Sequence, residues 1–266
     1  MNKLPPFIDK ILNDYVSQLN SIRPDLIEGI YLTGSVPLND YYPKKSDIDF
    51  ITVLKDSPGK EILKGIQHIH RNIETTHNYP KLNGYYLTIE GITGNQKSFP
   101  SFFKNRMYFD RPFELDKLTL WELKTSSYKV HGVPAADLPV TVELKEVITQ
   151  LHQNINSYWA SWIWKHSSFH LHHVLLILFP RLTEWGILGV ARQLYTIETG
   201  KIASKLKAGT YCLNNLPGDL RNIMLTALET RRINRTQLKP SLKRAKETLN
   251  CMKFIIAQFN KIYSGE

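Results

Sequence analysis

The sequence contains little cysteine and no long hydrophobic run. Its two cysteines, Cys212 and Cys251, are far apart and form no metal-binding or redox pattern, which argues against a disulfide framework. The longest apolar run, HHVLLILFP from His172, is far shorter than the roughly 20 residues of a membrane span and predicts a buried helix. The first residues, MNKLPPFIDKILNDYV, lack the apolar centre of a signal peptide. We therefore expect a cytoplasmic protein with free thiols and no membrane partner.

Acidic residues are scarce in the second half of the chain. Residues 1–140 carry 17 Lys and Arg against 16 Asp and Glu, whereas residues 141–266 carry 17 against 8. The net charge of +10 therefore comes almost entirely from the second half. This asymmetry favours a polyanionic ligand there, such as a nucleoside triphosphate or a nucleic acid. The alternative is that these lysines and arginines only keep the surface soluble.

The first half of the chain alternates between helical and strand-like patterns. Apolar residues at helical spacing predict helices, and runs rich in Ile, Tyr, Phe, Thr and Val predict strands. The predicted order is a helix at 7–19, strands at 29–32 and 47–54, a helix at 58–74 and a strand at 84–93. The pattern is irregular over 98–116 and helical again over 118–127. These elements predict a small mixed α/β domain over residues 1–140.

Every segment of the second half has a helical pattern. Pro180, Gly200, Pro217 and Pro240 separate these segments, as helix-breaking residues do. The predicted helices cover 141–164, 168–179, 182–199, 203–214, 217–231 and 240–263. The sequence thus predicts an α+β protein, with an all-helical second domain over residues 141–266.

Two aspartates stand one residue apart in the stretch IYLTGSVPLNDYYPKKSDIDFITVL, residues 30–54. Side chains alternate faces along a strand, so Asp47 and Asp49 project from one side, with roughly 7 Å between their backbone positions. Two carboxylates this close repel each other unless a cation lies between them. Mg²⁺ is the usual ion, because it is bound by one or two carboxylates together with substrate phosphates and water.

A Gly-Ser pair precedes the aspartates at the end of the first predicted strand. Gly34 allows a phosphate to approach the backbone closely, and Ser35 offers a hydroxyl group. Together, the pair and the aspartates predict a phosphate-binding turn beside a metal site.

These residues resemble the signature of the nucleotidyltransferase superfamily whose core is that of DNA polymerase beta. The match is carried by Gly34-Ser35 and by Ser46-Asp47-Ile48-Asp49. The resemblance implies that Asp47 and Asp49 hold Mg²⁺ on the triphosphate of a nucleotide, with Ser35 and Ser46 contacting the phosphates. An acceptor hydroxyl then attacks the α-phosphorus and expels pyrophosphate.

The segment EWGILGVARQLYTIETGKIASKLKAGTYCLNNLP, residues 184–217, extends the resemblance into the second half. It looks like the C-terminal domain of aminoglycoside adenylyltransferases of the streptomycin/spectinomycin type. In that family, residues matching Arg192 and Lys205 reach the nucleotide phosphates, and an arginine can hold phosphate through two hydrogen bonds. The resemblance implies ATP as co-substrate, although the sequence leaves ATP and GTP both open.

The transfer also needs a group that removes the proton of the acceptor hydroxyl. The family's base lies in a strand with the pattern LEVT, and two registrations with YYLTIEGIT are possible. One places Tyr86 at the position of the glutamate, and the other places Glu90 there. We predict Glu90 as the base, the alternative being that this carboxylate is missing.

The acceptor-binding residues are predicted from the start of the same C-terminal segment. Glu184 and Trp185 stand where the family's helical domain contacts its drug. The acidic sequence GDER expected there is replaced by LTEW, a departure that counts against streptomycin and spectinomycin but not against aminoglycosides in general.

The sequence therefore predicts a monomeric, Mg²⁺-dependent enzyme that transfers AMP from ATP to an aminoglycoside hydroxyl, conferring antibiotic resistance. Nucleic acid is not the expected partner. Two alternatives stay open: a nucleotidyltransferase that modifies a protein or an RNA, and a nonenzymatic nucleotide-binding relative.

Overall fold

A computed structural model describes most of the chain: residues 4–43, 45–77, 82–94, 98–112, 115–167, 171–233 and 239–265. The chain divides into two compact units, Met1–Glu143 and Leu144–Glu266. Each unit is described by itself below.

The first unit is built on one mixed sheet. Its strands in the described residues are β1 (Ile27–Thr33), β2 (Ile48–Leu54), β3 (Leu82–Thr88), β4 (Ser98–Phe103), β5 (Arg106–Pro112) and β6 (Tyr128–His131). The strand order is β5-β4-β3-β2-β1-β6. Only the β2–β3 pair is parallel, and the other pairs are antiparallel. The two strands that carry the predicted motifs, β1 and β2, therefore lie next to each other inside the sheet.

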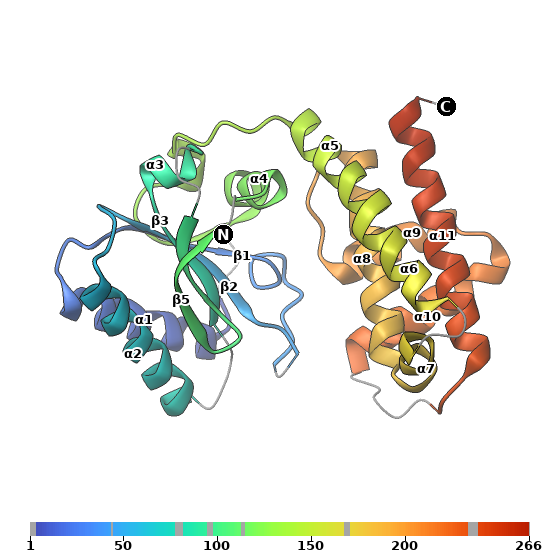
Figure 1. Ribbon diagram of the computed structural model, residues 1–266, viewed down its shortest axis with the longest axis horizontal. Helices are drawn as coiled ribbons and strands as arrows, with labels where there is room; N and C mark the ends of the chain where they lie inside the picture. Colours follow the sequence, from blue (N-terminus) through green and yellow to red (C-terminus); the bar gives the residue numbers. More distant parts are fainter. Residues whose placement is uncertain are drawn as a thin grey trace. The chain divides into compact units, whose positions relative to one another are not determined.

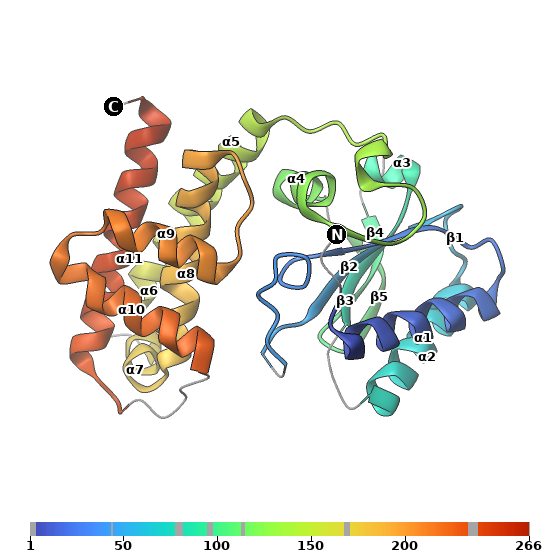
Figure 2. The same cartoon turned by 180° about the vertical axis from the view of Figure 1, so that it is seen from behind.

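Two helices cover one face of this sheet. They are α1 (Pro6–Ile22) and α2 (Lys60–His77), which lie side by side in Figures 1 and 2. Their apolar residues form one core with the alternate residues of the strands, such as Ile48, Phe50 and Tyr86. Because neighbouring residues of a strand point to opposite faces, Asp49 points to the other face.

The opposite face of the sheet is partly covered by α4 (Lys117–Ser126), which packs on β1 (Figure 1). The helix begins where the Asp116 side chain accepts a hydrogen bond from the Thr119 amide at 2.6 Å, a common N-terminal cap. A short 3₁₀ helix, η1 (Ala135–Asp137), follows β6.

The structure corrects the sequence prediction at three places in this unit, one of which is β6, where the sequence pattern predicted no strand. The strand predicted over 84–93 ends at Thr88, whose side chain accepts a hydrogen bond from the Gly91 amide and starts the one-turn helix α3 (Ile89–Ile92). The region predicted as irregular forms the β4–β5 hairpin. Its turn residues Lys104 and Asn105 both have positive φ, as a tight two-residue hairpin turn requires, but neither is glycine. This missing glycine is why the sequence pattern did not reveal the hairpin.

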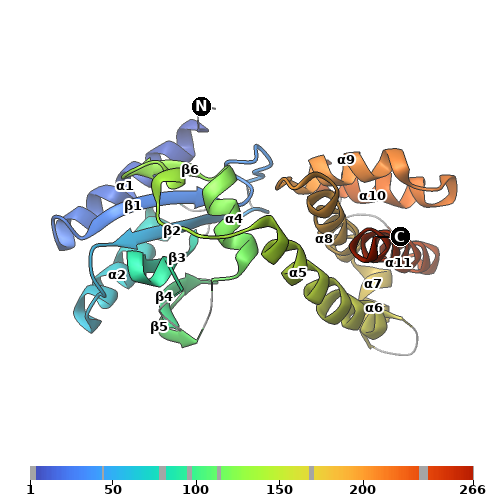
Figure 3. The same cartoon turned by 90° about the horizontal axis from the view of Figure 1, so that it is seen from above.

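The second unit is entirely helical in its described residues. Its elements are α5 (Leu144–Asn154), the π-helical turn η2 (Ile155–Trp159), α6 (Ala160–His166), α7 (Leu171–Leu178), α8 (Pro180–Thr199), α9 (Lys205–Asn215), α10 (Gly218–Ile233) and α11 (Leu242–Ser264). Helix α8 contacts α9, α10 and α11 (Figure 3). It ends at Gly200, whose φ of 67° suits glycine at a helix C-terminus. The start of the predicted helix 168–179 lies outside the described residues.

No single described helix is long and apolar enough to cross a membrane. Helices α7 and α8 pass that test of length and composition only as a pair, and they are bent by 99° relative to each other.

Candidate functional site

The Gly34–Ser35 turn lies directly against Asp49. Strands β1 and β2 pair antiparallel, with Thr33 opposite Asp49, so the turn that follows β1 is next to the start of β2. Gly34 has a φ of 71°, and a Cβ atom there would clash with the Asp49 carboxylate. Only glycine fits this position without strain, because both the backbone conformation and the space exclude a side chain.

A third carboxylate reaches the same turn. The Gly34 amide donates a hydrogen bond of 2.7 Å to Glu122 Oε1, from helix α4. Glu122 is only 9% exposed, and the bond places its carboxylate within about 8 Å of that of Asp49. The sequence analysis missed this residue. The available signal was an acid between Trp121 and Leu123, in a helix whose other buried residues, Leu120 and Leu123, are apolar.

Asp47 comes just before β2 and is partly buried. Burial, together with the negative charge of Asp47, raises the pKa of Tyr41 to about 12. Asp47 and Asp49 flank the buried Ile48 at the start of β2, so their carboxylates could share one cation at this edge of the sheet.

The two predicted serines have different surroundings. The Ser35 hydroxyl is buried and has no hydrogen-bond partner, so it is available for a ligand. The Ser46 hydroxyl instead accepts a hydrogen bond of 3.1 Å from the Tyr42 amide, and the Ser46 amide donates one of 2.9 Å to the Tyr42 carbonyl. Ser46 thus holds the turn that precedes the aspartates.

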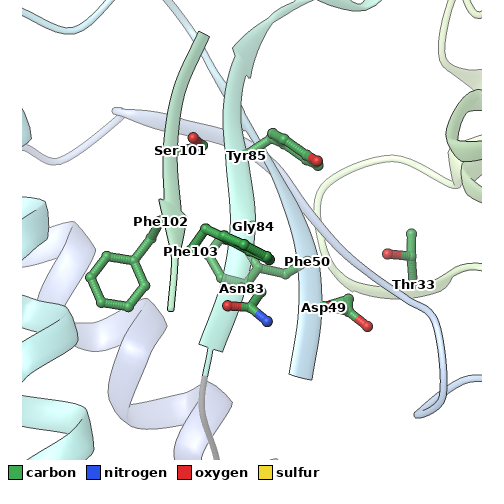
Figure 4. Close-up of a pocket in the computed structure, with 9 residues that line it drawn as sticks. All are labelled: Thr33, Asp49, Phe50, Asn83, Gly84, Tyr85, Ser101, Phe102 and Phe103. Atoms are coloured by element: carbon green, nitrogen blue, oxygen red, sulfur yellow. The ribbon is translucent and has the colours of Figure 1, made fainter. Parts of the chain in front are cut away.

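A pocket of about 240 Å³ lies beside Asp49 on the same face of the sheet. Figure 4 shows residues that line it, drawn from neighbouring strands. The lining residues are Thr33, Asp49, Phe50, Asn83, Gly84, Tyr85, Ser101, Phe102 and Phe103. The pocket therefore extends from Asp49 across β3 to β4.

The structure does not bring Glu90 to the aspartates. In the parallel β2–β3 pair, Asp49 is opposite Asn83, while Leu54 at the other end of β2 is opposite Thr88. Glu90 follows Thr88 on α3 and is exposed, so it lies about 16 Å or more along the sheet from Asp49. The strand assignment behind the Glu90 prediction was wrong. The β3 residue beside Asp49 is an amide, Asn83.

Arg192 is hydrogen-bonded to the segment that leads into α9, two residues before Lys205. Arg192 Nε, on α8, donates a hydrogen bond of 3.0 Å to the Ala203 carbonyl. Lys205 is the first residue of α9, whose N-terminus is capped by the Ser204 hydroxyl accepting from the Lys207 amide. Two cations and a helix N-terminus, which itself carries partial positive charge, thus share one region of the second unit.

Of the two predicted acceptor residues, Glu184 is buried in the helical unit and Trp185 is partly exposed. Glu184 is 6% exposed, and its Oε1 lies 3.5 Å from Arg231 Nη1. The Trp185 ring packs against Trp159 and Trp162, with ring centroids 4.7 and 5.8 Å away. These contacts give both residues a structural role.

The residues around the turn fit a magnesium–phosphate complex. Among the described residues no group of three His, Cys, Asp or Glu side chains could hold a metal by itself. Mg²⁺ does not need such a group, because it is commonly bound by one or two carboxylates and the phosphates of the substrate. Gly34 leaves room for a phosphate beside Asp49, and the unpartnered Ser35 hydroxyl can donate a hydrogen bond to that phosphate.

Comparison with known proteins agrees with this geometry. Residues 10–148 match the family described as nucleotidyltransferase domain, and residues 180–256 match the C-terminal domain of aminoglycoside adenylyltransferase. A comparison with curated protein sequences gives no significant match. The fold is similar to the crystal structure of spectinomycin adenyltransferase AAD(9) from Enterococcus faecialis with ATP and spectinomycin, with a TM-score of 0.67 and 14% identity. That similarity covers 95% of this chain and 99% of the other. The chain thus belongs to the nucleotidyltransferase family and is an adenylyltransferase with the helical C-terminal domain of the aminoglycoside enzymes.

Proposed function

We propose that this enzyme transfers AMP from ATP to a hydroxyl of an aminoglycoside, with Mg²⁺ bound by Asp47 and Asp49. The observation that carries the proposal is the Gly34–Ser35 turn lying against the Asp49 carboxylate. A triphosphate bound at this turn would be within reach of a cation on the aspartates. Bound Mg²⁺ would neutralise phosphate charge and favour the departure of pyrophosphate.

The chain's own residues would bind and orient the nucleotide. Ser35 would donate its free hydroxyl to a phosphate oxygen, and Glu122 would hold the Gly34 amide and with it the shape of the turn. Arg192 and Lys205 are proposed as further phosphate ligands, because cations gathered at a helix N-terminus attract anions.

The proposed substrates rest on the family and on the solved relative. The C-terminal match is to aminoglycoside adenylyltransferases, and the relative was crystallised with ATP and spectinomycin. We propose the same two classes of substrate here, with the individual drug open. The proposal includes a monomeric enzyme, which sedimentation with and without ATP would check.

The test is pyrophosphate release from Mg·ATP in the presence of spectinomycin, streptomycin and a panel of other aminoglycosides. We expect release that requires one drug, and a loss of at least about a hundredfold in Asp47→Asn and Asp49→Asn, since each removes a metal ligand. Chelation of Mg²⁺ should abolish release.

The control is Asp56→Asn, which changes an exposed aspartate that pairs with Arg23 outside the site. It should keep full activity. If no drug of the panel supports pyrophosphate release although ATP binds, the acceptor is not one of these aminoglycosides. Protein and RNA acceptors should then be tested.

A further inference from the structure

Helix α7 combines an apolar composition with high exposure. Six of its eight residues are aliphatic, yet Leu176 alone among them is buried. A helix that is apolar on every side normally lies in a protein core or in contact with lipid. Leu171, Val174 and Leu178 are spaced to share one face and are 73, 46 and 42% exposed. This face of α7 is therefore largely open to solvent.

Two further residues extend this open face. Phe179, between α7 and α8, is 53% exposed, and Leu242, the first residue of α11, is 49% exposed. The Ser241 amide donates a hydrogen bond of 3.2 Å to the Ile177 carbonyl, so the start of α11 lies against α7 at one end of the helical unit (Figures 1 and 2). Single exposed apolar residues are common, whereas a group of them on contacting elements marks an interaction site. We call this group the apolar patch: Leu171, Val174, Leu178, Phe179 and Leu242.

The two sequence segments that carry the apolar patch contain cations but no acids. Asp and Glu are absent from residues 147–183 and from residues 230–246. Of the acids that end these segments, Glu184 is buried against Arg231, and Glu247 lies 3.8 Å from Lys243. The apolar patch therefore lies in a region of positive charge.

Exposed cations stand beside the apolar patch. Arg181 and Lys243 are exposed and are one or two residues from the patch along the chain. The Arg244 guanidinium donates hydrogen bonds to the Lys239 carbonyl at 2.8 Å and to the Ile177 carbonyl at 2.6 Å, which keeps the exposed Lys239 near α7. Apolar and cationic side chains are thus combined on one surface.

We propose that this end of the helical unit binds the surface of an anionic lipid bilayer. The apolar patch enters the boundary between headgroups and acyl chains, and the cations contact the lipid phosphates. Lysine and arginine suit this arrangement, because their stems lie along apolar surface while their charges stay in water. With eight residues, α7 is too short to cross a bilayer. The sequence-based expectation of no membrane partner considered spanning segments and did not extend to contact with one leaflet.

The composition of this surface favours lipid over other partners. A symmetric dimer through the apolar patch would bring the same cations together, because such an interface pairs a surface with itself. Nucleic acid would pair with the cations, but its phosphates offer nothing to aliphatic side chains. Binding hot spots for proteins are enriched in Trp, Tyr and Arg, whereas the apolar patch is mostly Leu and Val, and lysine is depleted from protein interfaces.

The first experiment measures co-sedimentation of the full chain with lipid vesicles. One set contains phosphatidylglycerol and phosphatidylcholine in equal parts, and the other contains phosphatidylcholine alone. We expect binding to the anionic vesicles, at least about tenfold weaker binding to the neutral ones, and a loss of this difference at high salt. Equal binding to both compositions, or binding to neither, would overturn the proposal.

The second experiment tests the apolar side chains with a matched pair of variants, Leu178→Asn and Ile262→Asn. Both residues are near helix ends and similarly exposed, at 42% and 39%, but Ile262 is roughly 30 Å along α11 from Leu242. Leu171→Asn/Leu178→Asn should weaken binding to the anionic vesicles at least about tenfold, and Leu178→Asn should do so to a smaller extent. Ile262→Asn should bind as wild type, and circular dichroism checks that each variant is folded. An equal loss in Ile262→Asn would contradict the assignment to the apolar patch.

The third experiment tests the cations at constant net charge. Lys239→Gln/Lys243→Gln and Lys253→Gln/Lys261→Gln each remove two exposed lysines, but the second pair lies farther along α11. The first double variant should weaken binding to the anionic vesicles about tenfold, and the second should change it little. Equal losses would indicate general attraction to a basic protein and would overturn the proposed surface.

Sedimentation of the full chain without lipid tests the other occupant, a second copy. A dimer that Leu171→Asn/Leu178→Asn dissociates would overturn the lipid surface in favour of self-association. None of these measurements uses turnover, so their failure would leave the proposed function unaffected, and failure of the proposed function would leave the lipid surface unaffected.

Discussion

At the scale of single residues, Gly34 determines whether the site can exist. We expect Gly34→Ala to abolish turnover, because the new Cβ would push the Asp49 carboxylate away from its position. The positive φ of 71° should also destabilise the fold by about 1 kcal/mol, measured by urea unfolding. Gly94→Ala is the control: Gly94 also has a positive φ, of 92°, but has no atom within 4 Å of the added Cβ. It should lose some stability and keep its activity, and equal losses of activity in the two variants would contradict this reading.

The prediction of Glu90 as the base matched the family's strand pattern to residues beyond the end of β3, and a substitution can test it. We expect Glu90→Gln to keep near wild-type turnover, because the residue is exposed and lies beyond the far end of the β2–β3 pair from Asp49. Pyrophosphate release measures it, with Glu61→Gln, another exposed acid, as the control. A large loss specific to Glu90→Gln would restore this residue as the base.

At the scale of elements, α1, α2 and β3 are joined by a buried polar cluster. The Tyr86 hydroxyl is 2.5 Å from the Tyr15 hydroxyl and 2.6 Å from His70 Nε2, and the His70 ring stacks on Phe102 at 3.7 Å. Burial lowers the pKa of His70 to about 3. Its neutral form is therefore part of the folded core.

This cluster predicts how stability depends on pH. Below its ordinary pKa of 6.5, His70 binds a proton in the unfolded chain but not in the folded one. The contribution of neutral His70 to the free energy of unfolding is therefore complete above pH 6.5. It is lost as the pH falls towards 3, by up to about 1.4 kcal/mol per pH unit. Between pH 7 and 4, the free energy of unfolding measured with urea should change less with pH in His70→Phe than in wild type. The exposed His68 of the same helix provides the control, since His68→Gln should keep the wild-type slope.

Helices α8 and α10 are joined by the ion pair of Glu184 and Arg231, whose side chains are each 8% exposed. We expect Glu184→Gln to lower the free energy of unfolding by about 3 kcal/mol, because it leaves a buried arginine without its counter-charge. Glu184→Gln/Arg231→Met should recover part of this loss. If Glu184→Gln instead keeps its stability and raises KM for the drug, the residue binds the acceptor as the sequence resemblance implied.

At the scale of the whole molecule, the uneven charge predicts that the basic second unit contributes to nucleotide binding. Arg192→Ala and Lys205→Ala should each raise KM for ATP about tenfold, the usual cost of losing a charge-assisted hydrogen bond. Lys207→Ala is the control, because Lys207 is an exposed cation on the same helix that lies 5.6 Å from the Tyr195 ring. Equal effects of all three would indicate general attraction to a basic surface, which high salt would remove.

The sequence by itself was sufficient for the features that depend on local pattern. Apolar periodicity identified α1, α2 and most helices of the second unit, and the strand pattern identified β1 and β2. The mixed α/β unit followed by helices is confirmed, as is the family. The phosphate-binding turn and the aspartates could be recognised because their spacing along the chain is itself the signal.

Only the tertiary structure decided what lies beside Asp49, because neighbours across a sheet depend on strand register and not on distance along the chain. The register placed Asn83 there and left Glu90 beyond the far end of β3, on α3. The packing of α4 on β1 brought Glu122 to the Gly34 amide from a distant part of the sequence. The β4–β5 hairpin, hidden by a turn without glycine, completed the pocket with Ser101 and Phe103.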